Sequence, residues 1–142
     1  QIKVEIIKEI LKNYEDIKIS NNQLIKINYD QDILISEYKK IYELLGDGLD
    51  VNSINEKSFD RKYLKELFLI KKIYRVNSKL IISDIHLEKL ISIVKKLPKN
   101  FSVTDFKKES NLSRKYSIPY LELLDKLKIT TKIDKSGIRK IT

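Results

Sequence analysis

The apolar residues of this chain change their spacing several times along its 142 positions. Between Asp84 and Leu97 the intervals are three and four residues, which predicts an amphipathic helix that buries Leu87, Leu90, Ile91, Val94 and Leu97. A second, shorter helix is expected from Phe101 to Ser110, with Thr104 as its N-cap and Phe106 facing the core. Two helices are therefore predicted between residues 84 and 110.

The pattern changes from helical to extended toward the C-terminal end of the sequence. A third helix is predicted from the spacing of Leu121, Leu124 and Leu127. Thr131, Ile133 and Ile138 then flank the polar turn 134–137, which is typical of two short strands joined by a tight turn. Three helices followed by a hairpin are the element order of a winged helix, so we expect a mainly α fold with short β-hairpins (α+β).

This pattern recurs at a constant interval along the chain. Equivalent apolar positions in three segments are Ile7, Leu64 and Leu121; Ile10, Leu67 and Leu124; and Ile19, Val76 and Ile133. A polar turn accompanies each segment, at 20–22, 77–79 and 134–137. A repeat of this size indicates tandem copies of one unit. We expect a partial winged helix over residues 1–31 (its last helix and hairpin), a complete one over 32–83, and a complete C-terminal one over 84–142.

The middle unit carries helix signals of its own. We expect a first helix capped at Ser36 and ended by 46–48, a short second helix opened by a capping box from Ser53 to Glu56, and a third helix capped by Asp60. A hairpin over 72–82 completes the unit. No Gly- or Pro-rich linker separates it from the last unit, so the two should pack in a nearly fixed relation, without one continuous sheet.

Two serines can cap the third helix of the last unit. With Ser113 as the cap, Pro119 lies in the second turn and removes a helix hydrogen bond. With Ser117 as the cap, Pro119 lies in the first turn, where it is tolerated. The repeat favours Ser117, because Ser117 follows Asp60 at the same interval at which Leu121 follows Leu64.

The net charge of +9 is concentrated in the last unit. Residues 84–142 hold fourteen Lys and Arg against seven Asp and Glu, whereas residues 1–83 hold fifteen against thirteen. A general bias toward Lys is the alternative explanation. The local excess favours an anionic partner for the last unit.

Motifs for catalysis or cofactor binding are absent from the sequence. It contains no Gly-rich phosphate-binding motif and no Cys, and its one histidine, His86, is interpreted as a surface residue. We expect no enzymatic activity, no cofactor and no metal site. The absence of Cys fits a reducing cytoplasm, and no apolar run is long enough to predict a membrane span.

Basic side chains cluster around the predicted start of the third helix and on the hairpin. In a winged helix these places can converge on one surface, where Arg and Lys neutralise phosphates. Tyr116 can stack on an unpaired base; alternatively, it packs on Pro119 or Tyr120 and the lysines only keep the domain soluble. The candidate RNA-binding residues are Lys107, Lys108, Ser113, Arg114, Lys115, Tyr116, Lys132, Arg139 and Lys140.

The last unit resembles the C-terminal winged helix of the bacterial selenocysteine-specific elongation factor SelB. The resemblance is carried by Phe101–Phe106, Ser113–Glu122 and Leu124–Leu127. The run S-R-K-Y-S-I-P within the second segment is fairly specific, because a generic winged helix does not carry it. The sequence departs from the family pattern at Ser117, usually Ala, and Tyr120, usually Leu, which leaves the hairpin sequence preference open.

This resemblance implies a role in selenocysteine incorporation during protein biosynthesis. In the family, four winged helices follow a GTP-binding core, and the last binds the mRNA hairpin (SECIS) that directs selenocysteine insertion. The chain would be the RNA-recognition end, without the GTPase core. The implied partners are an mRNA stem-loop and, through that core, the ribosome and selenocysteinyl-tRNA. We expect a cytoplasmic monomer that makes no membrane contact.

Two other functions stay open: a tandem winged-helix DNA-binding transcription regulator, and a scaffold for protein contacts. Reading DNA requires Asn, Gln or Arg on the exposed middle of the recognition helix, whereas this helix offers Glu122 and Asp125. A compact RNA hairpin therefore fits better. We expect the last unit to hold most of the RNA affinity and residues 1–83 to act as a spacer.

Overall fold

The computed structural model describes residues 27–142, with side chains from residue 31 onward. The predicted last helix and hairpin of a first unit lie largely outside the described residues. The elements are α2 (Ile27–Leu45), η2 (Glu56–Ser58), α3 (Arg61–Leu69), β1 (Ile73–Arg75), β2 (Ile81–Ser83), α4 (Asp84–Lys95), β3 (Asn100–Phe101), α5 (Val103–Ser110), α6 (Arg114–Lys126), β4 (Thr130–Lys132) and β5 (Arg139–Ile141).

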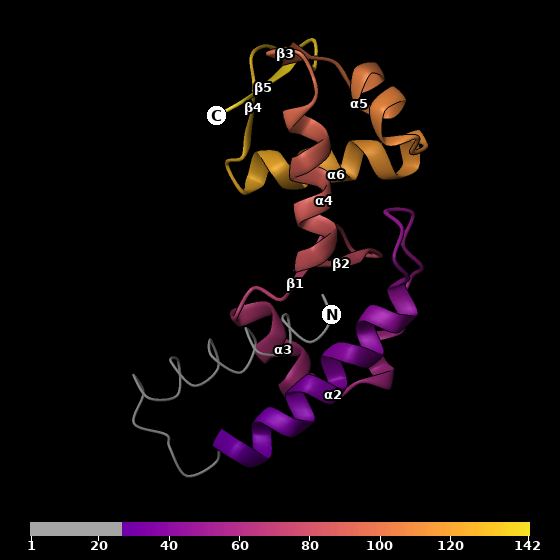
Figure 1. The fold of residues 1–142 in the computed structure, drawn as a ribbon, viewed down its shortest axis with the longest axis vertical. Helices are drawn as coiled ribbons and strands as arrows, with labels where there is room; N and C mark the ends of the chain where they lie inside the picture. Colours follow the sequence, from indigo (N-terminus) through magenta and orange to yellow (C-terminus); the bar gives the residue numbers. More distant parts are fainter. Residues whose placement is uncertain (1–26) are drawn as a thin grey trace.

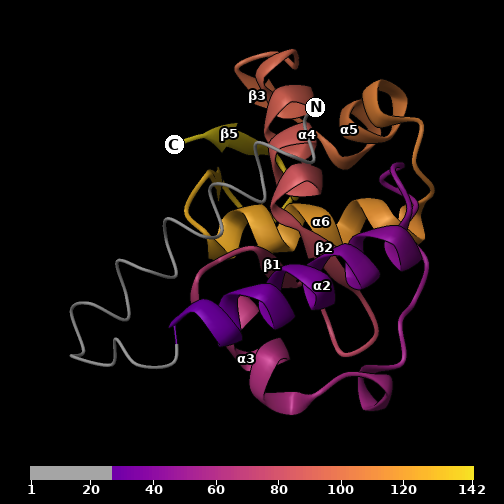
Figure 2. The same ribbon diagram turned by 60° about the horizontal axis from the view of Figure 1, so that its bottom comes forward.

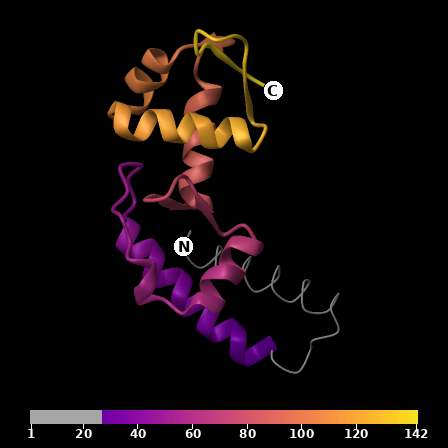
Figure 3. The same ribbon diagram turned by 180° about the vertical axis from the view of Figure 1, so that it is seen from behind.

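Two winged-helix units lie one above the other (Figure 1). The lower unit comprises α2, η2, α3 and the antiparallel hairpin β1–β2; the upper unit comprises α4, α5, α6 and an antiparallel sheet in the order β3-β5-β4. α4 extends from the lower hairpin to the upper sheet, as two other views also show (Figures 2 and 3). The two sheets are separate. The predicted mainly α, α+β fold of tandem winged helices is therefore confirmed.

α2 is longer than the sequence predicted. It continues through Ser36 without a break, so the predicted cap there is wrong and the boundary between residues 31 and 32 falls inside a helix. The reason is an uninterrupted apolar stripe at helical spacing, formed by the buried residues Leu34, Tyr38, Ile41 and Leu45. The helix ends at Leu45 and is followed, as predicted, by Gly46, whose φ of +89° suits glycine.

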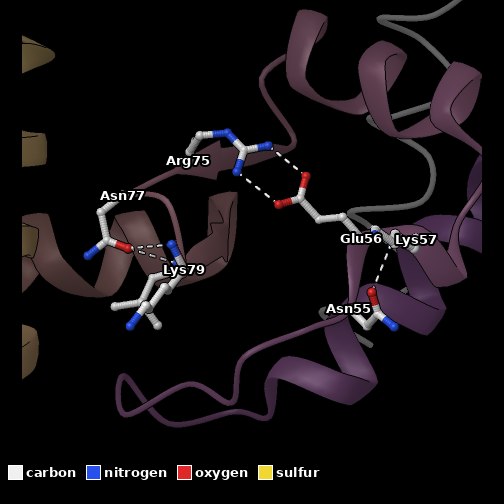
Figure 4. Close-up of polar contacts among 7 residues, drawn as sticks. Asn55, Glu56, Lys57, Arg75, Asn77 and Lys79 are labelled. Carbon is white, nitrogen blue, oxygen red and sulfur yellow. Dashed lines mark hydrogen bonds and ion pairs between the residues drawn. The ribbon is translucent and has the colours of Figure 1, made fainter.

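The predicted capping box of the second helix is also wrong. η2 is capped by Asn55, whose side chain accepts a hydrogen bond from the Lys57 amide. The Glu56 carboxylate instead binds Arg75 through two bonds of 2.7 and 2.9 Å (Figure 4), and Arg75 lowers the pKa of Glu56. The Asp60 cap of α3 is confirmed, because its side chain accepts from the Lys62 amide.

In the upper unit, α5 begins one residue earlier than its predicted cap. Ser102 is the N-cap and forms a capping box with Asp105, so the prediction of Thr104 is wrong. Phe101 lies in β3 and not in the helix, whereas Phe106 is fully buried as predicted.

α6 begins at Arg114, with Ser113 as the N-cap, so the favoured cap at Ser117 is wrong and Pro119 lies inside the helix. Ser117 is buried, and its hydroxyl donates to the Ser113 carbonyl at 2.9 Å. The Ser117 hydroxyl can donate to a helix carbonyl and so remain inside α6. Asp60, the equivalent residue of the preceding unit, has a carboxylate that cannot donate this bond and caps α3 instead.

The repeat is confirmed where each third helix turns into its strand. Lys71 and Lys128, which are equivalent in the repeat, adopt left-handed φ values of 62° and 63°. In each case the next residue's amide bonds a carbonyl of the last helical turn, Lys72 to Leu67 and Ile129 to Leu124, as in a Schellman motif. β1 and β4 then begin at equivalent positions of the two units, Ile73 and Thr130.

The buried apolar residues of both units form one continuous cluster. It runs from Leu34 and Leu67 below, through Leu90 of α4, to Phe106 and Leu124 above. Ser83 is both the last residue of β2 and the N-cap of α4, so no linker separates the units.

Replacing Lys128 by Gly should raise the free energy of unfolding by about 1 kcal/mol, because Gly adopts a positive φ without a Cβ penalty. Urea unfolding measures the change. The control is Glu122→Gly on the exposed face of α6, which should lower the free energy by about 1 kcal/mol. A destabilised Lys128→Gly variant would contradict the left-handed cap.

Candidate nucleic-acid interface

Five of the candidate residues surround the turn that joins α5 to α6. Asn111 ends α5 in the left-handed conformation, and Leu112 is buried beneath the turn. The last turn of α5 carries Lys107 and Lys108, and the first turn of α6 carries Arg114 and Lys115. We call Lys107, Lys108, Ser113, Arg114 and Lys115 the turn cluster; all but the half-buried Lys107 are exposed.

The backbone at the start of α6 favours binding of an anion beside these cations. Ser113 makes no side-chain capping bond, and its carbonyl accepts the amides of Tyr116 and Ser117 at 3.1 and 3.0 Å. The amides of Arg114 and Lys115 point out of the first turn, where the positive end of the helix dipole favours an anion. The turn cluster is therefore suited to bind phosphate.

Tyr116 is half-buried beside the turn cluster. Its ring centroid lies 6.1 Å from that of Tyr120, and its hydroxyl donates to the Val51 carbonyl at 3.1 Å. The Lys115 ammonium lies 5.4 Å from the Tyr116 ring centroid. Of the two interpretations left open by the sequence, the structure shows the packing of Tyr116 on Tyr120.

An open groove of about 450 Å³ lies next to the turn cluster. One wall comes from the loop that follows α2 and the other from the α5–α6 turn; the lining residues are Leu49, Asp50, Ser110, Asn111, Leu112, Ser113 and Tyr116. The groove therefore spans the boundary between the two units.

Arg139 does not belong to the exposed surface where the sequence placed it. Its side chain is 4% exposed, and Nε lies 2.9 Å from the Asp125 carboxylate, which also accepts from the Thr130 hydroxyl at 2.6 Å. Side chains alternate along a strand, so Arg139 faces the helices beside Phe101 while Lys140 faces outward. The guanidinium is thus paired with Asp125 and is not exposed on the wing.

The structure does not bring the remaining wing cations to the turn cluster. Lys132 and Lys140 are exposed, but β4 follows the C-terminal end of α6, whereas the turn cluster lies at its N-terminal end. A helix of 13 residues is about 20 Å long. Figures 1 and 2 show the hairpin and the turn at opposite sides of the upper unit.

Comparisons with known proteins support the winged-helix assignment of the upper unit. Residues 92–136 match the family described as elongation factor SelB, winged helix. A crystal structure of a bacterial selenocysteine-specific elongation factor, EF-Sec, superposes with a TM-score of 0.63 at 31% identity. The match covers 75% of this chain and 18% of that elongation factor. A search of curated proteins gave no significant match. The resemblance to the SelB winged-helix region is confirmed.

The S-R-K-Y run of this SelB-like unit also contacts the lower unit, which the sequence did not predict. Tyr116 and Tyr120, one helical turn apart on α6, donate to the carbonyls of Val51 and Leu49. Tyr120 is fully buried, and burial raises the pKa of its hydroxyl well above the ordinary value, so it stays a donor. The only signal in the sequence was the spacing of two tyrosines where the SelB pattern has one.

His86 is buried at the same boundary, and its assignment as a surface residue is wrong. Nδ1 accepts from the Ser83 amide at 3.2 Å, which makes Nε2 the donor to the Gly46 carbonyl at 2.7 Å. The imidazole thus caps α4 and contacts the end of α2. Its isolation in the sequence gave no sign of this role.

The described residues show neither a metal-binding cluster nor a candidate membrane span. In that part of the chain no three His, Cys, Asp or Glu side chains are placed to hold a metal ion. No helix between residues 27 and 142 is long and apolar enough to cross a membrane.

Arg139→Ala should lower the free energy of unfolding by about 2 to 3 kcal/mol, because it leaves the Asp125 carboxylate half-buried without its ion partner. Lys140→Ala, one residue along the same strand, should change it by less than about 0.5 kcal/mol. Urea unfolding distinguishes the two. Equal effects would show that the Arg139–Asp125 pair does not stabilise the wing.

Acidification below about pH 6.5 should destabilise the fold through His86. Burial lowers the pKa of His86, so the unfolded chain takes up a proton that the folded chain does not. The stabilisation is complete above the unfolded pKa and is lost as the pH falls from there toward the folded pKa. Unfolding free energies measured from about pH 7.5 to about pH 5.5 should decline in the parent and stay flatter in His86→Gln. Identical slopes would exclude this role.

Proposed function

We propose that this chain is the RNA-recognition region of a selenocysteine-specific elongation factor, and that its last unit binds the mRNA hairpin that directs selenocysteine insertion. One observation carries the proposal. The S-R-K-Y run that marks the SelB resemblance opens α6, with Arg114 and Lys115 exposed in its first turn.

The chemistry of the turn cluster supports an RNA ligand. Arg114 offers a planar guanidinium that binds a phosphate or a guanine edge through two bonds, a geometry that Lys cannot copy. Lys107 and Lys108 add charge from the end of the preceding helix. Lys132 and Lys140 supply a second, separate electrostatic contact from the wing.

The shape of α6 favours a hairpin over a DNA major groove. Its middle is buried through Tyr120, Leu121, Leu123 and Leu124, and the exposed residue there is Glu122. The cations instead gather at one end of the helix. A compact turn of this kind fits the backbone and loop of a folded RNA, whose own deep groove excludes side chains.

The proposed role of the full-length protein in translation rests on the similarity to the matched elongation factor. The chain spans 18% of the matched elongation factor, so the rest of that role is part of the proposal. We propose that the full-length protein works in the cytoplasm with the ribosome and selenocysteinyl-tRNA, and that this region takes part as a monomer without its own catalytic step.

A binding comparison at one salt concentration tests the ligand class. The probes are a candidate selenocysteine-insertion stem-loop from a selenoprotein mRNA, its duplex analogue and double-stranded DNA. The stem-loop should bind at least about tenfold tighter than either, a difference of about 1.4 kcal/mol. Equal or tighter binding of double-stranded DNA would favour a transcription regulator and reject the proposal.

Arg114→Ala should weaken binding of the stem-loop by about 1 to 3 kcal/mol. Lys107→Ala should weaken it less and reduce the slope of log affinity against log salt by about one, because one phosphate contact is lost. The matched control is Lys126→Ala at the far end of α6, which should leave affinity unchanged. Melting curves show that each variant is folded. Parent-like binding by Arg114→Ala would reject the turn cluster as the site.

A further inference from the structure

The loop that follows α2 is held to the upper unit through its backbone. Four of its carbonyls, at Gly46, Asp47, Leu49 and Val51, accept hydrogen bonds from upper-unit side chains. The donors are His86 and Lys89 on α4 and Tyr120 and Tyr116 on α6; the His86 and Lys89 bonds measure 2.7 and 2.6 Å.

The loop is also closed on its own unit. The Asn52 amide donates to the Leu45 carbonyl at 3.1 Å, and the Asn52 side chain donates to the Leu44 carbonyl at 3.2 Å. Val51 is 1% exposed and belongs to the continuous core. The loop is therefore hydrogen-bonded both to α2 of the lower unit and to α4 and α6 of the upper unit.

The contact between the loop and α6 lies next to the turn cluster, which is the proposed RNA-binding surface. Tyr116 follows Arg114 and Lys115 in the first turn of α6, and its hydroxyl binds Val51. Leu49 and Asp50 of the loop line the same groove as Ser113. A change in the loop would move or loosen the turn that presents the cations.

We propose that the loop over residues 46–51 is a positioning element of the RNA surface, and that Tyr116 and Tyr120 act through their hydroxyls as positioning residues that make both units bind as one body. This inference rests on the proposed function. It replaces the expectation that residues 1–83 are a spacer. A surface already held in its binding geometry loses less conformational freedom on association, so fixing α6 contributes to affinity without a contact to RNA.

A hydroxyl-only substitution separates this role from base stacking. Tyr116→Phe keeps the ring for stacking and removes the bond to Val51. Stacking predicts unchanged affinity for Phe, whereas positioning predicts a loss. The double variant Tyr116→Phe/Tyr120→Phe removes both bonds from α6, and Tyr74→Phe, a half-buried tyrosine of β1 outside the loop contact, is the matched control.

The experiment uses the 142-residue chain, which has no native Cys. Spin labels on Glu43→Cys in α2 and Lys126→Cys in α6 report the distance between the units. The parent and Tyr74→Phe should give one narrow distribution. The double variant should give a broad one and bind the stem-loop about tenfold more weakly at a temperature where melting curves show it folded.

The outcomes separate the inference from the proposed function. A double variant with a narrow distance distribution, or with a broad one and parent-like affinity, overturns the positioning role while hairpin binding by the parent stands. If the parent does not bind the stem-loop, the proposed function fails, and the positioning role of the loop fails with it. Gly46→Ala provides a variant outside the turn cluster: its φ of +89° strains any side chain, and it should broaden the distances as the double variant does.

Discussion

The arrangement of the two units depends on Asp84, the first residue of α4. Its carboxylate accepts the Tyr38 hydroxyl at 2.6 Å and the Lys72 ammonium at 3.4 Å, and its amide donates to the Lys72 carbonyl at 2.9 Å. The helix dipole favours a negative charge at this position. α2, α4 and the residue before β1 thus meet at one side chain, directly after the last strand of the lower unit.

This junction explains why the candidate interface lies where it does. Because α4 begins without a linker, the loop after α2 lies against α4 and α6, and the carbonyls of that loop meet the hydroxyls of α6. The start of α6 then projects beside the loop with Arg114 and Lys115 exposed. The linker-free start of α4 therefore determines both how the two units pack and where the cations of α6 are exposed.

The sequence predicted the elements that depend on periodicity and missed those that depend on competing partners. Helical spacing located α3 and α4, and the internal repeat located β1 and β4. The Asp60 cap was predicted correctly, but two others failed because a side chain had a better partner: Glu56 binds Arg75, and Ser117 bonds within α6. The turn cluster was predicted from a local motif. Arg139 was misplaced because its partner Asp125 lies on a different element, at the far end of α6, and cannot be read from local pattern.

Charge alone would assign RNA recognition to the last unit, since it holds most of the net positive charge. The structure qualifies that argument, because the surface beside those charges is built partly from backbone of the lower unit. Backbone carbonyls accept hydrogen bonds whatever side chain they carry, so such a contribution leaves no mark in charge or composition. The contacts between the units therefore have to be considered together with the charges, and here the proposed positioning role rests on those of Tyr116 and Tyr120 with the loop after α2.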